Sequence, residues 1–378
     1  MKIALVGPYP TDLQKIPGGV AAVTYYLAQG LAGHPDNDIH IIAATKHVEH
    51  DNVIRHGPLT VHYLSYPQVR IMPNQMRDIR RIRTVLRELK PDIVHSQTPS
   101  GADAASQLGL PCVLTIHGIP EQERRFAKGL SNRLGAALAP WLTRRALRRA
   151  DAAIAISPYV TDSYRDCPNL TWYNISNPIE DRFFETCNNA LPGKLLYAGV
   201  MSERKNIPGL VRAFKRVSER NADAQLYICG KVVDEQVFAE TKRYIDGEGL
   251  AARVHLLGFV SQEELARHFA EAAVLCLFSN EETAPMIIAQ AMCAGKPVVS
   301  TAAGGVPYLM RDGESGFVVP MEDEAAFAER VLTLLGDTQL QSRMGNFGRQ
   351  LANDLFRTES VAQQTIAVYR EVLARRRR

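Results

Sequence analysis

Short apolar runs alternate with longer amphipathic stretches along the whole chain. In the first half, the apolar runs predict strands at Ile3–Val6, Ile39–Ala43, Val61–Leu64, Ile93–His95, Val113–His117, Ala152–Ile156 and Thr171–Ile175. Between them, helical periodicity predicts helices that include Val20–Leu31, Gln75–Leu89 and Ala102–Leu108. This alternation is typical of βαβ units, in which a parallel sheet carries helices on both faces.

The same alternation starts again after a turn-rich segment at residues 177–193. Six further strands are predicted at Leu195–Ala198, Leu226–Cys229, Val254–Leu257, Val274–Phe278, Val298–Ser300 and Phe317–Val319. The predicted fold class is therefore α/β, with two facing Rossmann-like, doubly wound domains at residues 1–178 and 192–358 and a cleft between them. A last helix within residues 359–378 is expected to pack back on the first domain.

Composition restricts the class of protein. Of the 378 residues, 46% are hydrophobic and 22% are charged, which is enough to build real cores. No apolar run approaches the roughly 18 residues needed to cross a bilayer, and the start of the chain reads as a buried strand rather than a signal peptide. The six cysteines are scattered and favour reduced thiols in a cytoplasmic protein over disulfides or a zinc site.

The strongest chemical signal lies between Ser279 and Met292. A predicted strand ends at Phe278, a polar loop follows, and a helix is expected to open near Pro285, because proline suits a first helical turn. The free N–H groups and the dipole of such a helix favour a phosphate. Glu282 and Gln290 are about 12 Å apart at a helical rise of ~1.5 Å per residue, a span that suits a sugar and a ribose on either side of a diphosphate. A capped helix with a solvated acid is the structural alternative.

This segment resembles the Glu-x7-Glu motif of family 4 retaining glycosyltransferases, which have the GT-B fold. Ala294–Val299 and Gly304–Pro307 are also typical of that family. The resemblance implies that Glu282 contacts the donor sugar and that the loop and first helical turn help to hold the phosphates; these residues are Thr283, Ala284, Pro285, Met286 and Ile287. Gln290 stands where the family usually has Glu, and its amide can still hydrogen-bond ribose hydroxyls.

Two more segments occur where the family would place them. Gly18 and Gly19 follow the first strand and open a predicted helix, so the backbone there can approach a phosphate closely. They do not form a Gly-x-Gly-x-x-Gly fingerprint, so NAD is not suggested. After the first strand of the second domain comes Gly199, followed by Arg204 and Lys205, two cations that can neutralise a diphosphate leaving group. Val200 departs from the family, which often has Arg directly after this glycine. The alternative interpretation of Arg204 and Lys205 is a solvated turn.

His117 ends a predicted strand in a Thr-x-His sequence. A lone histidine at a strand end is often structural, but the resemblance implies that it contacts the transferred sugar. Asp36-Asn37-Asp38 is an Asp-x-Asp string, a type that can hold a metal, yet it lies between Pro35 and an edge-like strand and is interpreted as a loop. No metal is expected to be required, and the only cofactor-like molecule implied is the nucleoside diphosphate sugar itself, with UDP favoured.

Basic residues are concentrated in one region. The formal net charge is only +4, but residues 69–150 hold fifteen Lys and Arg against six Asp and Glu, and four arginines end the chain. Residues 121–150 interleave arginines with leucines, Phe126 and Trp141, which could suit an anionic membrane surface or a lipid-linked acceptor. The same residues fit a solvated helix face equally well. Nucleic acid is disfavoured because no recognition motif accompanies the charge.

Together these features predict a hexosyltransferase that moves a sugar from a nucleotide-sugar to a glycan, lipid-linked or small-molecule acceptor, and the resemblance to family 4 implies retention of configuration. Such an enzyme of polysaccharide biosynthesis would be cytoplasmic or peripheral at the inner membrane face. Two rivals share the architecture: a sugar-nucleotide 2-epimerase, for which no paired carboxylates are found, and a non-catalytic subunit, for which Gln290 and Val200 are the only hints.

Overall fold

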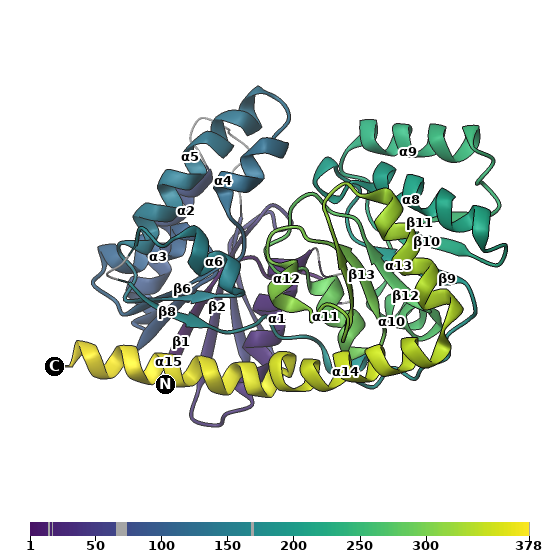
Figure 1. The fold of residues 1–378 in the computed structure, drawn as a ribbon. Helices are drawn as coiled ribbons and strands as arrows, with labels where there is room; N and C mark the ends of the chain where they lie inside the picture. The colour runs from purple at the N-terminus through teal and green to yellow at the C-terminus, as the bar shows by residue number, and fades with distance from the viewer. Residues whose placement is uncertain (14–15, 17, 66–73, 168–169, 378) are drawn as a thin grey trace. The chain divides into compact units, whose positions relative to one another are not determined.

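The computed structural model describes residues 1–13, 16, 18–65, 74–167 and 170–377, which form two compact units (Figure 1). The first unit comprises Met1–Pro178 together with Phe356–Arg378, and the second comprises Ile179–Leu355. The C-terminal helix therefore belongs to the first unit. Two of the range limits given above, Val69 and Arg378, lie outside the described residues.

Within the described residues, the first unit contains one sheet of eight strands in the order β3-β4-β2-β1-β5-β6-β7-β8. Their bounds are β1 Lys2–Val6, β2 Asp38–Thr45, β3 Asn52–His56, β4 Leu59–Ser65, β5 Ile93–Ser96, β6 Cys112–Ile116, β7 Ala152–Ala155 and β8 Thr171–Asn174. The helices are α1 Gly19–Ala32, α2 Asn74–Leu89, α3 Pro99–Gln107, α4 Pro120–Glu123, η1 Arg124–Phe126, α5 Leu130–Leu147, α6 Pro158–Ser163 and α15 Thr358–Arg376.

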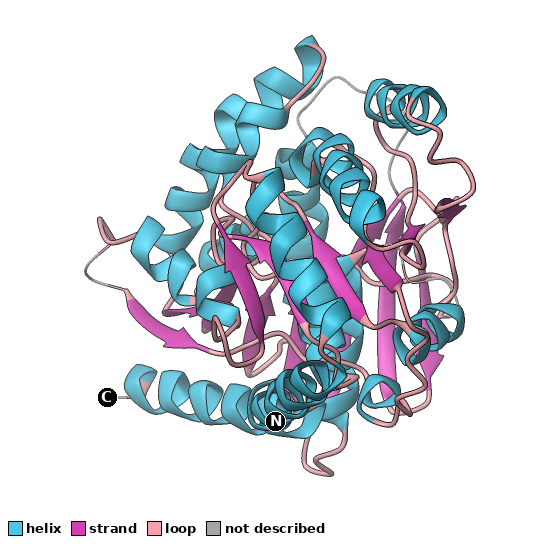
Figure 2. Cartoon of the chain, turned by 45° about the vertical axis from the view of Figure 1, so that its right-hand side comes forward, coloured by secondary structure: helices cyan, strands magenta, loops and turns pink. Residues whose placement is uncertain are grey.

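The described part of the second unit contains one parallel sheet of six strands in the order β11-β10-β9-β12-β13-β14. Figure 2 shows the strands of the chain in magenta and the helices beside them in cyan. Its strands are β9 Lys194–Ala198, β10 Gln225–Cys229, β11 Val254–Gly258, β12 Val274–Leu277, β13 Val298–Thr301 and β14 Gly316–Val319. The helices are α7 Asp181–Phe184, η2 Glu203–Lys205, α8 Ile207–Arg220, α9 Glu235–Gly247, α10 Gln262–Glu271, α11 Met286–Cys293, α12 Val306–Leu309, α13 Glu324–Gly336 and α14 Thr338–Phe356.

Every strand expected from an apolar run is present, so the α/β class is confirmed. Within the part of the chain that the structure describes, one strand was missed. β3 is almost entirely exposed and pairs antiparallel with β4, so it lacks the apolar run that marks a buried parallel strand. In addition, β6 ends at Ile116, which leaves His117 as the first residue beyond that strand.

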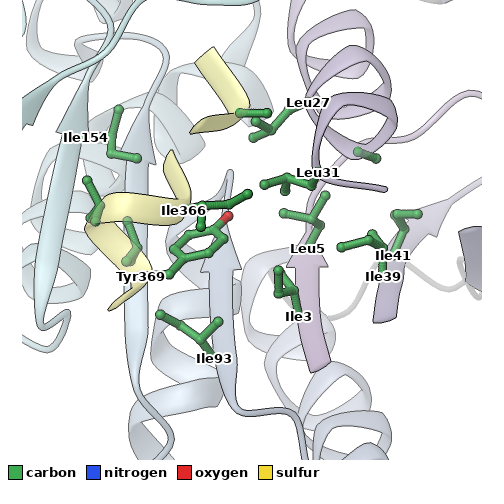
Figure 3. Close-up of a cluster of buried hydrophobic side chains, with 14 of the residues drawn as sticks. Ile3, Leu5, Leu27, Leu31, Ile39, Ile41, Ile93, Ile154, Ile366 and Tyr369 are labelled. Atoms are coloured by element: carbon green, nitrogen blue, oxygen red, sulfur yellow. The ribbon is translucent and has the colours of Figure 1, made fainter. Parts of the chain in front are cut away.

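The first sheet buries both of its faces. Ile3 and Leu5 point to one side, where they pack in a core with α1 and with Ile366 and Tyr369 of α15 (Figure 3). Val6 points to the other side, toward α3. Since α15 contributes buried side chains to this core, it is an integral layer of the first unit.

Each sheet has a position where the order of strands reverses along the chain. In the first sheet this position lies between β1 and β5, and in the second it lies between β9 and β12. Open α/β sheets bind ligands outside the carboxyl ends of the strands at such positions. The residues that follow these four strands are therefore the first candidates for ligand binding.

Candidate functional site

The carboxyl ends of β9 and β12 bring two distant segments together in the second unit. The backbone N–H of Asn280 donates to the carbonyl of Arg204 at 2.8 Å, and the Asn280 side chain donates to the carbonyl of Glu203 at 3.1 Å. The hydroxyl of Thr301, at the end of neighbouring β13, donates to the carbonyl of Ser279 at 2.6 Å. These bonds fix the loop after β12 against η2, which carries Arg204 and Lys205.

Glu282 is the centre of a compact charged cluster. Lys205 Nζ donates to Glu282 Oε1, and the Ser279 hydroxyl donates to the same oxygen at 2.7 Å. Arg204 lies on the other side, with its guanidinium 3.6 Å from Glu282 Oε2 and donating to the carbonyl of Glu281 at 3.1 Å. We call Arg204, Lys205 and Glu282 the charged cluster; with two cations and one carboxylate it carries an excess positive charge.

Burial sets the electrostatics of the charged cluster. Glu282 is 3% exposed and Lys205 is 9% exposed. Burial lowers the pKa of Lys205 from its usual range, while the adjacent Glu282 acts in the opposite direction. Tyr197 of β9 interacts electrostatically with Glu282 and Arg204 and is fully buried, and burial raises the pKa of its hydroxyl well above the usual range. Because charge interactions are stronger away from water, an anion that enters this cluster would be attracted more strongly than at the surface.

Gly199 occupies a position that other residues would strain. Its φ of +156° lies in the positive range, and a Cβ there would stand 2.9 Å from the hydroxyl oxygen of Tyr197. Gly230, after the neighbouring strand β10, has a φ of +153° and would bring a Cβ to 1.7 Å from the carbonyl oxygen of Gly199. The two glycines let the ends of β9 and β10 approach closely, as the ligand-facing edge of an open sheet requires.

The expected helix after the loop is α11, but it begins one residue later than expected. Pro285 is the residue before the helix, with φ −66° and ψ 110°, rather than part of its first turn. Only Met286–Gln290 of the motif is helical, so the helical spacing does not apply over the whole interval from Glu282 to Gln290. Thr283, Ile287 and Gln290 are buried, and Ala284 and Met286 are half-buried. The Glu282 carbonyl accepts from Gly305 at 2.7 Å, which ties the motif to the Gly304-Gly305 loop.

His117 belongs to the first unit, where it ends a chain of hydrogen-bonded side chains. Its Nε2 lies 2.6 Å from Gln97 Oε1, and Gln97 Nε2 lies 3.2 Å from His95 Nε2. His95 is completely enclosed, with Nε2 at 2.7 Å from the Thr115 hydroxyl and Nδ1 at 2.6 Å from the Tyr369 hydroxyl. We call these five residues the neutral chain. Burial lowers the pKa of His117 to about 4 and that of His95 to about 3, so both rings are uncharged at neutral pH.

The sequence analysis identified the residues of the charged cluster and His117 of the neutral chain, but it missed the residues that hold them in place. Ser279, Gln97 and His95 were not singled out, although each lies at the carboxyl end of an apolar strand run. Asn206 was also missed: it adopts the left-handed conformation with φ 47° and caps α8 by accepting from Gly209 N at 3.1 Å. Asparagine tolerates that conformation better than most residues, which is the signal that could have found it.

Gly18 and Gly19 lie in the first unit, at the start of α1. Gly18 is the residue before the helix, with φ 101° and ψ 171°, a combination that is essentially restricted to glycine. A Cβ at Gly18 would meet none of the described residues within 4 Å, and the requirement for glycine there is conformational. Gly19 is the first helical residue.

The basic region is partly used for internal ion pairs. Asp103, almost fully buried in α3, pairs with Arg145 and Arg149 at 3.0 and 2.8 Å. Arg144 pairs with Glu121 at 3.0 Å and also contacts Asp166. Four basic residues near the start of α5, namely Arg124, Arg125, Lys128 and Arg133, are exposed. The basic charge of 121–150 is therefore divided between internal pairs that hold α5 and an exposed part.

Helix α5 also presents apolar side chains to solvent. Leu134, Leu138 and Trp141, spaced by four and three residues, are 63%, 50% and 55% exposed. They lie along one side of the helix because residues three and four apart share a face. None of the described helices is long and apolar enough to cross a membrane.

Among the described residues, no group of three or more His, Cys, Asp or Glu side chains is placed to hold a metal ion. Asp36 and Asn37 lie in the turn before β2, and Asp38 begins that strand. Asp38 contacts His40 at 3.2 Å. The Asp38 carboxylate therefore has a partner within the first unit.

Comparison with known proteins identifies the family. Residues 17–180 match the family described as Glycosyltransferase Family 4, and residues 179–351 match the family described as Glycosyl transferases group 1. This chain is a family 4 glycosyltransferase. The two matches meet at residues 179–180, where the structure also changes from its first unit to its second.

Named relatives of this glycosyltransferase are sugar-transferring enzymes. It is 25% identical over 280 residues to the alpha-D-kanosaminyltransferase of Streptomyces kanamyceticus, covering 70% of this chain and 72% of the relative. It is 27% identical over 314 residues to the alpha-maltose-1-phosphate synthase of Mycolicibacterium smegmatis, covering 75% and 79%. The chain is thereby an enzyme of the transferase class.

Solved structures confirm the GT-B fold of the glycosyltransferase. Sucrose-phosphate synthase from Thermosynechococcus elongatus superposes with a TM-score of 0.82 at 22% identity, covering 99% of each chain. HepE of Anabaena, solved in complex with UDP and glucose, superposes with a TM-score of 0.74 at 18% identity, covering 97% of this chain and 98% of that one. At these identities the likeness establishes the architecture alone.

Proposed function

We propose that this glycosyltransferase takes its sugar from a nucleoside diphosphate sugar, with UDP as the preferred nucleotide, and transfers it with retention of configuration to a glycan, lipid-linked or small-molecule acceptor. The observation that carries the proposal is the charged cluster at the strand-order reversal of the second sheet, next to the start of α11. Cations and the N–H groups at a helix start together favour the binding of a diphosphate. The UDP in the HepE complex is further support for the choice of nucleotide.

The cluster suggests how binding begins. In the structure Lys205 and Arg204 both face the Glu282 carboxylate. A diphosphate that approaches α11 would compete with Glu282 for these cations and release the carboxylate toward the donor's sugar hydroxyls. This exchange is in line with the sugar-contacting role that the family resemblance implies for Glu282, and it assigns the neutralisation of phosphate to Arg204 and Lys205.

For the chemical step we propose attack on the same face of the sugar from which the diphosphate leaves. The bond from the acceptor oxygen to the anomeric carbon forms as the bond from that carbon to the diphosphate oxygen breaks, and the acceptor's proton passes to the departing diphosphate. Arg204, Lys205 and the N–H groups at the start of α11 would stabilise the developing negative charge, with no metal required. Thr283, Ala284, Pro285, Met286 and Ile287 would line the phosphates, and Gln290 would bind the ribose.

The proposal is tested by supplying UDP-, GDP- and ADP-sugars with a panel of glycan and lipid-linked acceptors. The expected result is release of UDP coupled to a glycoside whose anomeric proton coupling shows the donor's configuration. A product of inverted configuration would contradict the retaining mechanism. An epimerised nucleotide-sugar formed without release of UDP would replace the proposal by the epimerase alternative.

We also propose that the α5 surface, defined by Leu134, Leu138 and Trp141 with the exposed cations at its start, binds the face of an anionic membrane. Between residues 124 and 150 the chain has eight Lys and Arg and no Asp or Glu. Exposed apolar side chains flanked by cations suit the interface of an anionic bilayer. Such a surface would bring the enzyme to a lipid-linked acceptor at the inner face of the cell membrane.

Co-sedimentation with phosphatidylglycerol vesicles tests the α5 surface. Leu138→Ser combined with Trp141→Ala should reduce binding, and raised salt should weaken binding by the wild type. Val53→Ser is the matched control, because Val53 is an exposed apolar residue of β3 in the same unit. Equal binding by the double variant and this control would contradict the membrane proposal.

A further inference from the structure

The neutral chain of the first unit has a property that the proposed function does not use: its donors and acceptors determine which nitrogen of His117 carries the proton. An amide oxygen can only accept a hydrogen bond, and an amide NH₂ can only donate. Gln97 Oε1 lies 2.6 Å from His117 Nε2, so in this orientation of the amide that nitrogen carries the proton. A neutral imidazole has one N–H, so Nδ1 of His117 is left with a lone pair.

The same reasoning applies to the buried end of the chain. Gln97 Nε2 donates to His95 Nε2 at 3.2 Å, and the Thr115 hydroxyl lies 2.7 Å from the same nitrogen and can donate to it. His95 Nε2 is therefore unprotonated, and Nδ1 holds the proton and donates to the Tyr369 hydroxyl at 2.6 Å. With the Gln97 amide oriented toward His117 through its oxygen, one proton arrangement is compatible with all of these contacts.

The backbone holds Gln97 in this position. Its N–H donates to the carbonyl of Val6 at 2.7 Å, which ties the end of β5 to the end of β1. Gly7 leaves room for the side chain, since a Cβ there would lie 2.7 Å from the Cβ of Gln97. Gln97 is 5% exposed, so water has little access to compete for its amide. The amide is thus fixed at the strand-order reversal of the first sheet.

We propose that Gln97 is a positioning residue that holds His117 in the Nε2–H tautomer, so that His117 Nδ1 accepts a hydrogen bond from a hydroxyl of the sugar substrate. This inference rests on the proposed function for the identity of the substrate, and it deepens that function by giving His117 the role of acceptor rather than cationic donor. The low pKa of His117, about 4, is consistent with a ring that stays neutral at the pH of the reaction.

The tautomer can be measured directly on the wild-type enzyme. Histidine labelled with ¹⁵N, observed by long-range proton–nitrogen correlation, distinguishes a protonated from an unprotonated ring nitrogen, and a His117→Gln variant assigns the signal. The expected result at neutral pH is a protonated Nε2 and an unprotonated Nδ1. A protonated Nδ1, as a reversed Gln97 amide would produce, would overturn the inference without any variant of Gln97.

Two substitutions test the role of Gln97. Gln97→Met keeps the volume and removes both polar atoms, so a mixture of the two His117 tautomers and a fall in kcat of about tenfold are expected. Gln97→Glu keeps an acceptor for Nε2–H and should retain the tautomer. Gln107→Met is the control, since Gln107 is a surface amide of α3 in the same unit that bonds to Arg83. An unchanged tautomer in Gln97→Met would overturn the inference.

Binding of UDP separates this inference from the function on which it rests. Stabilisation by UDP should be equal in the wild type and in Gln97→Met, because Gln97 is not among the proposed nucleotide contacts. A wild type that neither binds UDP nor transfers sugar would contradict the proposed function. A Gln97→Met enzyme with wild-type kcat and an altered tautomer would contradict the role of Nδ1 while leaving the proposed function intact.

Discussion

The carboxyl ends of strands at or next to the strand-order reversals carry different chemistry in the two sheets. In the second unit, the ends of β9 and β12 hold Arg204, Lys205 and Glu282, three buried or half-buried charges. In the first unit, the ends of β5 and β6 hold Gln97 and His117, which are neutral and joined to further neutral groups. The fold provides the position, and the residue types decide what binds there. Charges suit phosphate, whereas a fixed neutral chain suits the oriented hydroxyls of a sugar.

The largest effect is expected for Lys205→Ala. If the charged cluster neutralises the leaving group, turnover should fall by about 10²–10³-fold, as it does when one donor to a developing oxyanion is removed. Steady-state release of the nucleoside diphosphate measures this. Lys215→Ala is the matched control, because Lys215 forms ion pairs with Glu219 and Glu248 at the surface of the same unit. Unaltered turnover in Lys205→Ala would show that the charged cluster takes no part in the reaction.

Glu282→Gln tests the buried charge balance of the cluster. The variant leaves Lys205 and Arg204 without their carboxylate, and removal of one partner from a buried ion pair costs about 3 kcal/mol of unfolding free energy. Urea denaturation provides the measurement. Glu324→Gln serves as comparison, since the Glu324 pair with Arg212 is more exposed and should change stability by under about 1 kcal/mol. Equal losses in both variants would show that burial does not distinguish the two pairs.

Acid should weaken the first unit through its neutral chain. The pKa values of His95 and His117 are lowered to about 3 and about 4 from the ordinary 6.5. Between pH 6.5 and pH 4 the unfolded chain therefore binds protons that the folded chain does not, so stability is present above this window and is lost as the pH falls through it. Each histidine contributes up to about 1.4 kcal/mol per pH unit.

The contribution of His117 is isolated by comparing urea unfolding of the wild type and of His117→Gln across this window. Because the variant has one fewer depressed histidine, its stability should fall less steeply on acidification. Identical slopes would mean that His117 is not kept neutral by burial.

The smallest effect is expected for Tyr369→Phe. This change removes the hydroxyl that accepts from His95 Nδ1 and leaves a buried donor unpaired, at a cost of about 1 kcal/mol. Thermal or urea unfolding measures the loss, and Tyr308→Phe, at an exposed residue of the second unit, is the control. Because α15 carries Tyr369, no loss of stability would mean that this hydroxyl does not help to hold the helix.

The sequence predicts the elements of this fold well because burial on both faces makes parallel strands nearly continuous apolar runs. It could not predict β3, whose exposed residues carry no such run. Strand order is also absent from the pattern. The reversal between β9 and β12 places Arg204 beside Glu282, and the pairing of β5 with β6 places Gln97 beside His117; neither pair is close in sequence.

The candidate site was predictable where a motif existed. Glu282, Lys205 and His117 came from segments that resemble a family. The other residues of the neutral chain belong to no such motif. Tyr369, for example, lies 274 residues beyond His95 and reaches it only through the packing of α15 on the first sheet. Likewise, the ion pair between Lys205 and Glu282 depends on the burial of both side chains, which no local pattern encodes.

The most direct test of the account is a thermal-shift titration with UDP, GDP, ADP and NAD on the wild type, Lys205→Ala and Lys215→Ala. A nucleotide at ~100 times its dissociation constant should stabilise the fold by about 2.7 kcal/mol. We predict selective stabilisation by UDP in the wild type and Lys215→Ala, and its loss in Lys205→Ala. No stabilisation of the wild type by any nucleoside diphosphate, or an equal shift in Lys205→Ala, would contradict the claim that the charged cluster is the donor site.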